Sequence, residues 1–214
     1  MERFLMNELV AWKNSRRRKP LILNGARQVG KTWLLKEFGK TQFEKVAYVS
    51  LDANEAARAL FDANFDMGRI IDGLSLLTGV RIEPSSTLII LDEIQSAPKA
   101  LTALKYFCEE ASDYAVAAAG SLLGISAMEG SGYPVGKVDT LNLHPMSFRE
   151  FLDATGERML RELVDKGDLA LIDAFRDREA LALKRYCVVG GMPAVVNSYI
   201  QKGTFEGTLE LQRQ

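Results

Sequence analysis

The stretch that decides the fold is "LILNGARQVGKTWLL", residues 21–35. It contains the pattern G-x-x-x-x-G-K-[ST], which is met by Gly25, Gly30, Lys31 and Thr32. Glycine at both ends of the pattern lets the backbone turn so that its N–H groups point at phosphate oxygens. The lysine brings a mobile positive charge to the phosphates, and the threonine hydroxyl can ligate Mg²⁺. The stretch therefore predicts a phosphate-binding loop.

The sequence on both sides of the loop agrees with this interpretation. "PLILN", residues 20–24, is apolar and predicts a short buried strand with Pro20 at its start. Beyond the loop, three apolar residues fall on one face of a helix, and Gly39 is expected to end that helix as its C-cap. These apolar residues are Leu34, Leu35 and Phe38. The alternative is a glycine-rich turn that binds nothing, but strand, loop and helix follow one another as a phosphate loop requires.

Composition limits the class of protein. The chain has 214 residues, enough for one good-sized core and a smaller helical unit. Its 47% hydrophobic and 26% charged residues are typical of a globular protein and exclude a disordered one. A net charge of -1 and a pI of about 6.0 give no bulk attraction to nucleic acid or to an anionic membrane.

One basic cluster stands out locally. "KNSRRRKP", residues 13–20, lies just before the first predicted strand. A solvated linker is one interpretation, and a contact with a nucleic-acid backbone or an acidic partner is the other. Because the cluster lies between an amphipathic segment and the predicted core, the solvated linker is the favoured interpretation.

Cysteine usage and apolar stretches indicate the compartment. Cys108 and Cys187 fit no metal or disulfide spacing, so we expect ordinary thiols in a reducing compartment. Polar and charged residues interrupt the apolar pattern of the N-terminus, which therefore lacks the core of a signal peptide. The most apolar later stretch, residues 115–128, contains Gly and Ser and is too short to span a bilayer. We expect a cytoplasmic protein that does not bind membranes.

Apolar strands alternate with helical patterns over the first two thirds of the chain. Further strands are predicted at residues 45–52, 87–95, 114–121 and 136–143. This alternation indicates an α/β fold: a P-loop NTPase with three α/β/α layers and a mostly parallel five-stranded sheet. Residues 53–79 look helical with a break near Asp66 to Gly68.

The predicted domain organisation has three parts. Residues 1–19 form an N-terminal helix and basic linker, residues 20–146 the ATPase core, and residues 147–214 a helical lid or appendage. The last part opens with "SFRE", a capping box that begins at Ser147, and contains one break at residues 189–193.

Two acids close the strand at residues 87–95. Asp92 is expected to hold Mg²⁺ together with Thr32, and Glu93 to orient and deprotonate the attacking water. Alternatively, both acids cap the next helix. Ser121, at the end of another strand, is placed to contact the γ-phosphate or the water, or else belongs to a simple Gly-Ser turn. Because ligands bind at the carboxyl ends of parallel strands, these residues should converge on the loop.

The expected site has both catalytic and nucleotide-binding residues. Glu93, Lys31 and Ser121 are the catalytic candidates. The residues expected to bind the nucleotide are Gly25, Ala26, Arg27, Gln28, Val29, Gly30, Lys31, Thr32 and Trp33. An arginine that reaches the transition state accelerates hydrolysis about 10³–10⁵-fold. Nothing in the sequence selects among the candidates Arg149, Arg158, Arg161, Arg176, Arg178 and Arg185. The lone His144 is interpreted as a strand-end residue.

With these motifs in place, the chain resembles the bacterial and archaeal AAA-type ATPases of the AAA domain 14 family. The resemblance lies in "KPLILNGARQVGKTWLL", "LIILDEIQ", "AAAGSLLGI", "YPVGKVDTLNLHPMSFREFL" and "GGMPAVV", in that order. It implies that the Ser121 strand lies between the loop strand and the acidic strand. It also implies ATP as the nucleotide, in agreement with the absence of an N-K-x-D motif. The resemblance further implies a longer chain with another C-terminal domain, so we expect "TLELQRQ", residues 208–214, to be part of a polar helix that continues in a longer protein.

Three functions follow as expectations. The first is Mg²⁺-dependent ATP hydrolysis that drives a conformational change in an unknown protein partner or in the further C-terminal domain. The second is a nucleotide-dependent binding switch with negligible turnover. The third is a nucleic-acid-associated or defence ATPase, which rests on the basic cluster and on analogy. A site shared between subunits would favour an oligomer.

Overall fold

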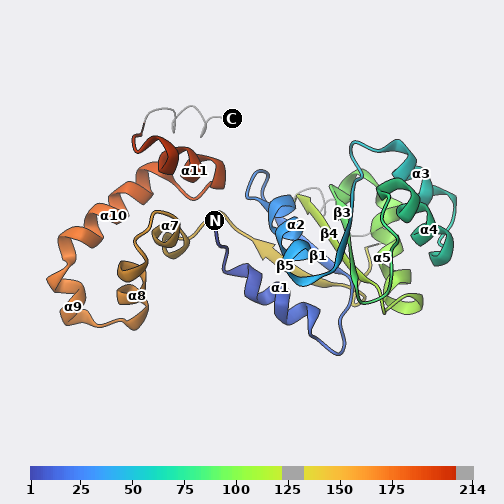
Figure 1. Ribbon diagram of the computed structural model, residues 1–214, viewed down its shortest axis with the longest axis horizontal. Coiled ribbons are helices and arrows are strands. Elements are labelled where there is room, and N and C mark those ends of the chain that lie inside the picture. The colour runs from blue at the N-terminus through green and yellow to red at the C-terminus, as the bar shows by residue number, and fades with distance from the viewer. Residues whose placement is uncertain (122–132, 206–214) are drawn as a thin grey trace. The chain divides into compact units, whose positions relative to one another are not determined.

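The computed structural model describes residues 1–121 and 133–205, which fall into two compact units. The sheet unit comprises Leu5–Leu143. The helical unit comprises Met1–Phe4 and His144–Gln214. Both are drawn in Figure 1, and each is described by itself.

A five-stranded sheet forms the centre of the sheet unit. Its strands are β1 (Leu21–Gly25), β2 (Lys45–Ser50), β3 (Thr87–Asp92), β4 (Ala115–Ser121) and β5 (Asp139–Leu143). Their order is β2-β3-β4-β1-β5, and every neighbouring pair is parallel. The predicted parallel sheet is confirmed, as is the place of the Ser121 strand between the loop strand and the acidic strand.

Helices cover both faces of this sheet, as in P-loop ATPases (Figure 1). They are α1 (Leu5–Lys13), α2 (Lys31–Gln42), α3 (Glu55–Ala63), α4 (Met67–Thr78) and α5 (Pro98–Glu110), with a short 3₁₀ helix η1 (Ile94–Ser96). Buried residues of α3, α4 and α5 form one core with β2, β3 and β4. Helix α2 packs on the other face, and α1 packs on α2 through the Trp12 and Phe38 rings, whose centres are 6.1 Å apart. The three-layer prediction is confirmed.

The break predicted near Asp66 to Gly68 is found at residues 64–66, so Gly68 already lies in the next helix. Helix α3 ends at Ala63 and α4 begins at Met67. The Asp66 carboxylate accepts a hydrogen bond from the Arg69 N–H (2.9 Å), which caps the start of α4.

The prediction that Gly39 ends the second helix is wrong. Helix α2 continues to Gln42, and the Phe43 N–H donates to the Gly39 carbonyl (3.0 Å). A Cβ at Gly39 would lie 2.6 Å from Cγ2 of Val46 on β2. The glycine therefore lets the helix lie close to the sheet, which is a packing role inside the helix and not a terminal one.

The helical unit contains α7 (Phe148–Ala154), α8 (Arg158–Lys166), α9 (Leu169–Ala174), α10 (Arg176–Val189) and α11 (Pro193–Lys202). The predicted capping box at the start of α7 is confirmed, because the Ser147 hydroxyl accepts from the Glu150 N–H (3.3 Å) and Glu150 accepts from the Ser147 N–H (2.9 Å). The break at residues 189–193 joins α10 to α11; a Cβ at Gly191 would overlap the Met146 carbonyl oxygen. The predicted polar helix at residues 208–214 lies outside the described residues.

A buried ion pair ties the first residues of the chain to α7. The Arg3 Nε donates to Glu150 Oε1 (3.0 Å), and both residues are 6% exposed. Arg3 also donates to the carbonyl of His144 (2.6 Å), and the Phe4 N–H donates to Glu150 Oε1 (2.9 Å). Burial raises the pKa of Glu150, but the hydrogen bonds from Ser147, Phe4 and Arg3 outweigh it and hold that pKa below its ordinary value. The sequence did not indicate a role for Arg3.

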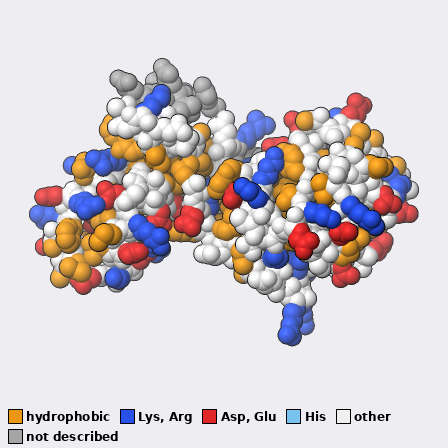
Figure 2. Space-filling model, in the orientation of Figure 1, with side chains coloured by type: hydrophobic (Ala, Val, Ile, Leu, Met, Phe, Trp, Pro, Cys, Tyr) orange, Lys and Arg blue, Asp and Glu red, His pale blue; other side chains and the backbone are white. Residues whose placement is uncertain are grey.

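The basic cluster lies on the loop between α1 and β1. Figure 2 shows a projecting group of Lys and Arg side chains at this loop. Arg16 and Arg17 are exposed, whereas Arg18 donates to the Asp113 carbonyl (3.2 Å) and lies 5.8 Å from the centre of the Trp12 ring. Part of the cluster therefore has a structural role in the sheet unit.

None of the helices within residues 1–121 and 133–205 has the length and apolar character that a membrane-spanning segment needs.

Candidate nucleotide site

The loop between β1 and α2 has the backbone geometry of an anion-binding turn. Gln28 and Gly30 both have left-handed backbone, with φ of 63° and 94°. Alternation of right- and left-handed residues makes successive N–H groups converge on one point. Helix α2 begins at Lys31, and the Leu34 N–H bonds the Gly30 carbonyl (2.9 Å). The loop therefore ends at a helix N-terminus, where the partial positive charge of the helix favours anions.

Gly25 is required by the neighbouring strand. A Cβ at this position would overlap the backbone oxygen of Leu143 on β5. Gly25 pairs with Leu143 on one side and with Ser121 on the other. The loop therefore leaves the sheet at its carboxyl edge, directly beside the end of β4.

Lys31 is buried and held by the loop itself. Its ammonium group donates to the carbonyls of Gly25 (3.0 Å) and Ala26 (2.7 Å). Burial lowers the pKa of Lys31, and the nearby charges of Glu93 and Asp92 oppose that change. The positive charge is thus placed beside the loop and near two carboxylates.

Asp92 is the centre of a hydrogen-bond network at the end of β3. The Thr32 hydroxyl donates to Asp92 Oδ2 (2.7 Å), and the Tyr48 hydroxyl donates to the same oxygen (3.0 Å). The Glu93 N–H donates to Asp92 Oδ1 (3.1 Å). Asp92 is 4% exposed, and its carboxylate accepts hydrogen bonds from α2, from β2 and from Glu93, the residue that follows β3.

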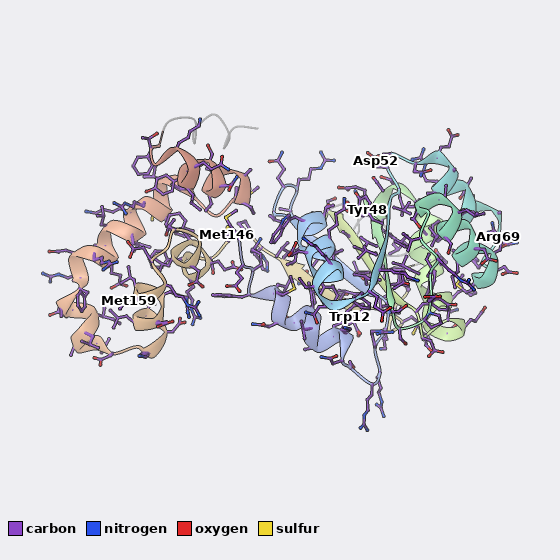
Figure 3. All side chains as sticks on the ribbon, in the orientation of Figure 1. Trp12, Tyr48, Asp52, Arg69, Met146 and Met159 are labelled. Carbon is purple, nitrogen blue, oxygen red and sulfur yellow. The ribbon has the colours of Figure 1, made fainter. Side chains whose placement is uncertain are left out.

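Tyr48 is a member of this network that the sequence reasoning missed. It lies on β2, which pairs with the acidic strand, and Figure 3 labels it. Burial and the adjacent Asp92 charge raise the pKa of Tyr48 to about 12. The Lys36 ammonium lies 3.5 Å from the centre of the Tyr48 ring, a cation–π distance. The only signal in the sequence was a tyrosine hydroxyl within a largely apolar strand.

Glu93 has an unusual backbone. Its φ and ψ are 52° and 48°, in the left-handed region that non-glycine residues rarely adopt. It precedes η1, yet its side chain makes no capping hydrogen bond, and α5 begins at Pro98 without a side-chain cap. The geometry therefore gives no support to the alternative that the two acids serve as helix caps.

Gln95 connects Glu93 to Ser121. The Gln95 side-chain amide donates to Glu93 Oε2, and Gln95 Oε1 accepts from the Ser121 N–H (3.4 Å). Ser121 is the last residue of β4. Gln95 was not among the predicted site residues; its position two residues after Glu93 was the signal that could have found it.

Glu93, Gln95 and residues of the loop line one cavity, whereas Asp92, Tyr48 and Ser121 are not among its lining residues. It measures about 710 Å³, within the range of about 300–1,000 Å³ typical of small-molecule sites. It is lined by Arg27, Gln28, Gly30, Lys31, Thr32, Trp33, Asp52, Glu93, Gln95 and Ser96. The Trp33 side chain is 46% exposed, and Asp52, labelled in Figure 3, bonds the Ser96 hydroxyl (3.4 Å).

The predicted site residues lie at this edge of the sheet, with one difference. Val29 is fully buried, so its side chain is not available to a nucleotide. Val29 packs near the position that a Cβ on Gly25 would take. The arginine candidates belong to the helical unit, and all except Arg185 form ion pairs with carboxylates there. These pairs are Arg149–Asp165, Arg158–Glu162, Arg161–Asp153, Arg176–Asp173 and Arg178–Glu157.

The comparison with protein families decides the family. The model of an AAA domain family, AAA domain 14, matches residues 17–152. The chain belongs to this AAA domain family. The match includes the loop, the acidic strand and the start of α7, and the resemblance stated from the motifs is confirmed. The AAA domain has the nucleotide-binding fold of P-loop ATPases.

One solved structure shares the fold of this AAA domain protein, and others align with it more weakly. A Walker-type ATPase of Pyrococcus abyssi aligns with 98% of this chain and 70% of its own, with a TM-score of 0.60 and 14% identity. The Orc1 protein of Aeropyrum pernix, in complex with DNA, covers 70% of this chain at a TM-score of 0.44 and 18% identity. A variant of the RuvB protein of Thermotoga maritima covers 75% at a TM-score of 0.44 and 16% identity. The chain spans 45% and 50% of these last two. No curated protein matches it in sequence.

Proposed function

We propose that the chain binds ATP with Mg²⁺ in the loop cavity and hydrolyses it. The observation that carries the proposal is the hydrogen bond between the Thr32 hydroxyl and the Asp92 carboxylate, beside Lys31 and next to Glu93. A phosphate loop whose Thr or Ser contacts an acid at a neighbouring strand end is the arrangement that P-loop ATPases use. ATP is preferred over GTP because the sequence has no N-K-x-D motif.

The loop residues would bind the phosphates. Backbone N–H groups from Ala26 to Thr32 supply donors at the start of α2. The Lys31 ammonium, which donates to two loop carbonyls, would bind a phosphate oxygen instead when the nucleotide is present. Arg27 and Trp33 line the same cavity and are exposed enough to contact the remainder of the nucleotide.

The donor set fits Mg²⁺. The Thr32 hydroxyl and the Asp92 carboxylate are hard oxygen ligands already in contact, and Mg²⁺ keeps several waters beside one or two such ligands. Bound there, the ion would neutralise charge on the phosphates. Tyr48 keeps the Asp92 carboxylate oriented through its own hydrogen bond.

Glu93 would accept a proton from the attacking water. Glu93 lines the cavity together with the loop residues, and it directly follows Asp92 in the chain. General-base catalysis of this kind contributes about 10²–10⁴-fold. Ser121, at the end of β4, would provide a polar contact to the γ-phosphate or to the water.

Hydrolysis would drive a conformational change in a protein partner or in a further domain. A nucleotide-dependent switch with negligible turnover is the second candidate, favoured by one observation. Among the arginine candidates of the helical unit, those other than Arg185 are engaged with carboxylates. An arginine supplied by a second subunit would restore turnover.

A nucleic-acid-associated function is a third candidate. The observation that favours it is the exposure of Arg16 and Arg17 on the projecting loop. Phosphate contacts weaken steeply as salt increases. DNA binding that is undetectable at low salt would exclude this candidate.

Thermal unfolding with phosphate release tests the main proposal. The chain is heated with and without Mg·ATP, Mg·GTP and a non-hydrolysable ATP analogue. At 100 times its dissociation constant a ligand stabilises the fold by about 2.7 kcal/mol. Stabilisation by ATP together with phosphate release supports the enzyme, and stabilisation without release supports the switch. The absence of any stabilisation would refute nucleotide binding at this loop.

A further inference from the structure

Gln95 occupies a position that none of the proposed roles uses. It lies in η1 and lines the cavity between the end of β3 and the end of β4. Both ends of its amide are engaged: the NH₂ donates to the Glu93 carboxylate, and the carbonyl accepts from the Ser121 N–H. A glutamine has one donor group and one acceptor group, and each is matched to a partner of the opposite kind.

We propose that Gln95 is a positioning residue for Glu93, which it holds in the orientation needed to accept a proton from water. The proposal rests on the proposed role of Glu93 as the general base. In this role, the two hydrogen bonds of Gln95 connect the Glu93 carboxylate to Ser121. They hold the carboxylate in place relative to the end of β4.

The backbone of Glu93 explains why such a link is needed. The left-handed backbone of Glu93 fixes the direction of its Cα–Cβ bond. The three torsion angles of the side chain remain free to rotate. A general base must lie within hydrogen-bond reach of the proton that it takes. Among the described residues, Gln95 is the one whose side chain bonds the Glu93 carboxylate, and it bonds Oε2. A water would approach the other carboxylate oxygen under this proposal.

The link also connects Glu93 to the loop strand. β4 pairs with β1 so that Ser121 lies opposite Gly25, the first residue of the phosphate loop. A displacement of the end of β4 would therefore move Gln95 and with it the carboxylate. Under this proposal, the distance between the Glu93 carboxylate and the phosphate loop is set by Gln95 and the end of β4. Rotation about the side-chain bonds of Glu93 would then not change it.

Three variants separate this role from simple packing. Gln95→Glu keeps the shape but replaces the donor with a second carboxylate beside Glu93. Gln95→Ala removes both hydrogen bonds. Gln201→Ala, an exposed glutamine of α11, is the control that should behave as the wild type.

We expect Gln95→Ala and Gln95→Glu to lower kcat about 10- to 100-fold, since misplacement by about 1 Å costs that much, with KM within about twofold of wild type. Adding Gln95→Ala to Glu93→Gln should lower kcat no further, because both changes act on one group. A Gln95→Glu variant with wild-type kcat would assign Gln95 to packing and overturn the proposal. The proposal would also be overturned if Gln95→Ala lowered kcat by the same factor in the Glu93→Gln variant as it does in the wild type.

A second readout does not depend on hydrolysis. NMR three-bond couplings report whether the Glu93 side chain holds one rotamer or averages over several. We expect one rotamer in the wild type and averaging in Gln95→Ala. A Glu93 side chain that already averages in the wild type, with Mg·ATP analogue bound, would overturn the inference. A fixed rotamer that Gln95→Ala releases, in a chain that does not hydrolyse ATP, would support the link and refute the proposed enzymatic function.

Discussion

Thr32 and Asp92 are 60 residues apart in the chain, and a hydrogen bond of 2.7 Å joins the hydroxyl of the first to the carboxylate of the second. This contact connects the phosphate loop to the acidic strand although β4 separates their two strands in the sheet. Under the proposed function, these two oxygens would bind Mg²⁺ together. The predictions below start from this contact and from the groups around it.

Lys31→Ala should abolish ATP binding, because it removes the positive charge that the loop directs to the phosphates. The side chain bonds only loop carbonyls, so the fold should tolerate its loss. Titration of ATP followed by the fluorescence of the exposed Trp33 measures the affinity. Lys40→Ala, an exposed lysine at the end of the same helix, is the matched control and should bind as the wild type. ATP affinity in Lys31→Ala equal to that of the control would contradict the prediction.

Glu93→Gln should bind Mg·ATP as the wild type does and lose turnover by about 10²-fold or more. The variant keeps the size of the side chain and removes its ability to take a proton. Single-turnover phosphate release and equilibrium binding, measured on the same preparation, separate the two effects. Wild-type hydrolysis in Glu93→Gln would exclude Glu93 as the general base.

Glu93→Gly should be more stable than Glu93→Ala by about 1 kcal/mol, because glycine adopts left-handed backbone without the steric cost of a Cβ. Both variants lack the carboxylate, so the difference isolates the backbone term. Urea unfolding at equal protein concentration gives the two free energies of unfolding. Identical values would mean that the left-handed conformation of Glu93 carries no strain.

Tyr48→Phe should flatten the alkaline dependence of stability. The pKa of Tyr48 is raised from 10.0 to about 12 in the folded state. Between these values the unfolded chain loses the hydroxyl proton and the folded chain keeps it, so the wild-type free energy of unfolding decreases as pH rises. Below pH 10 the contribution of the hydroxyl is fully present. Urea unfolding of both proteins, at pH values from about 8 to about 12, measures the difference between their free energies of unfolding. Parallel curves would contradict the assigned hydrogen bond to Asp92.

Arg3→Ala should destabilise the helical unit by about 3–5 kcal/mol, since it leaves the buried Glu150 carboxylate without its cation. Arg158→Ala, which breaks an exposed pair with Glu162, should cost no more than about 1 kcal/mol.

The pKa of Glu150 is lowered in the folded state. Its contribution is therefore present above the ordinary value of 4.5 and is lost as pH falls through the folded pKa. Acid unfolding followed by circular dichroism should show the wild type losing this advantage over Glu150→Gln below that pH.

Much of the sheet unit could be predicted from local patterns. Strands β1 to β4 are short, largely apolar runs between turn residues, whereas β5 alternates polar and apolar residues. The loop pattern placed Gly25 to Thr32 at a strand end. Because the carboxyl ends of parallel strands share one edge, the meeting of Thr32, Asp92 and Ser121 followed from the fold class.

The missed residues depend on contacts that no local pattern contains. Tyr48 reaches Asp92 from 44 residues away, and Arg3 reaches Glu150 from 147 residues away. Gly39 was wrongly taken as a helix end because a glycine late in a helical pattern commonly has that role. Its reason lies instead in Val46 of the adjacent strand, which a sequence pattern of one helix cannot reveal.

The ion pair between Arg3 and Glu150 makes the helical unit discontinuous along the chain. Its first four residues are synthesised before the whole sheet unit, and their binding site on α7 emerges only afterwards. The unit is therefore not a portable segment. A graft of residues 144–205 onto another protein would contain the buried Glu150 carboxylate but would lack Arg3 and Phe4, which donate to it. Transfer of this unit to another protein therefore requires the first four residues as well.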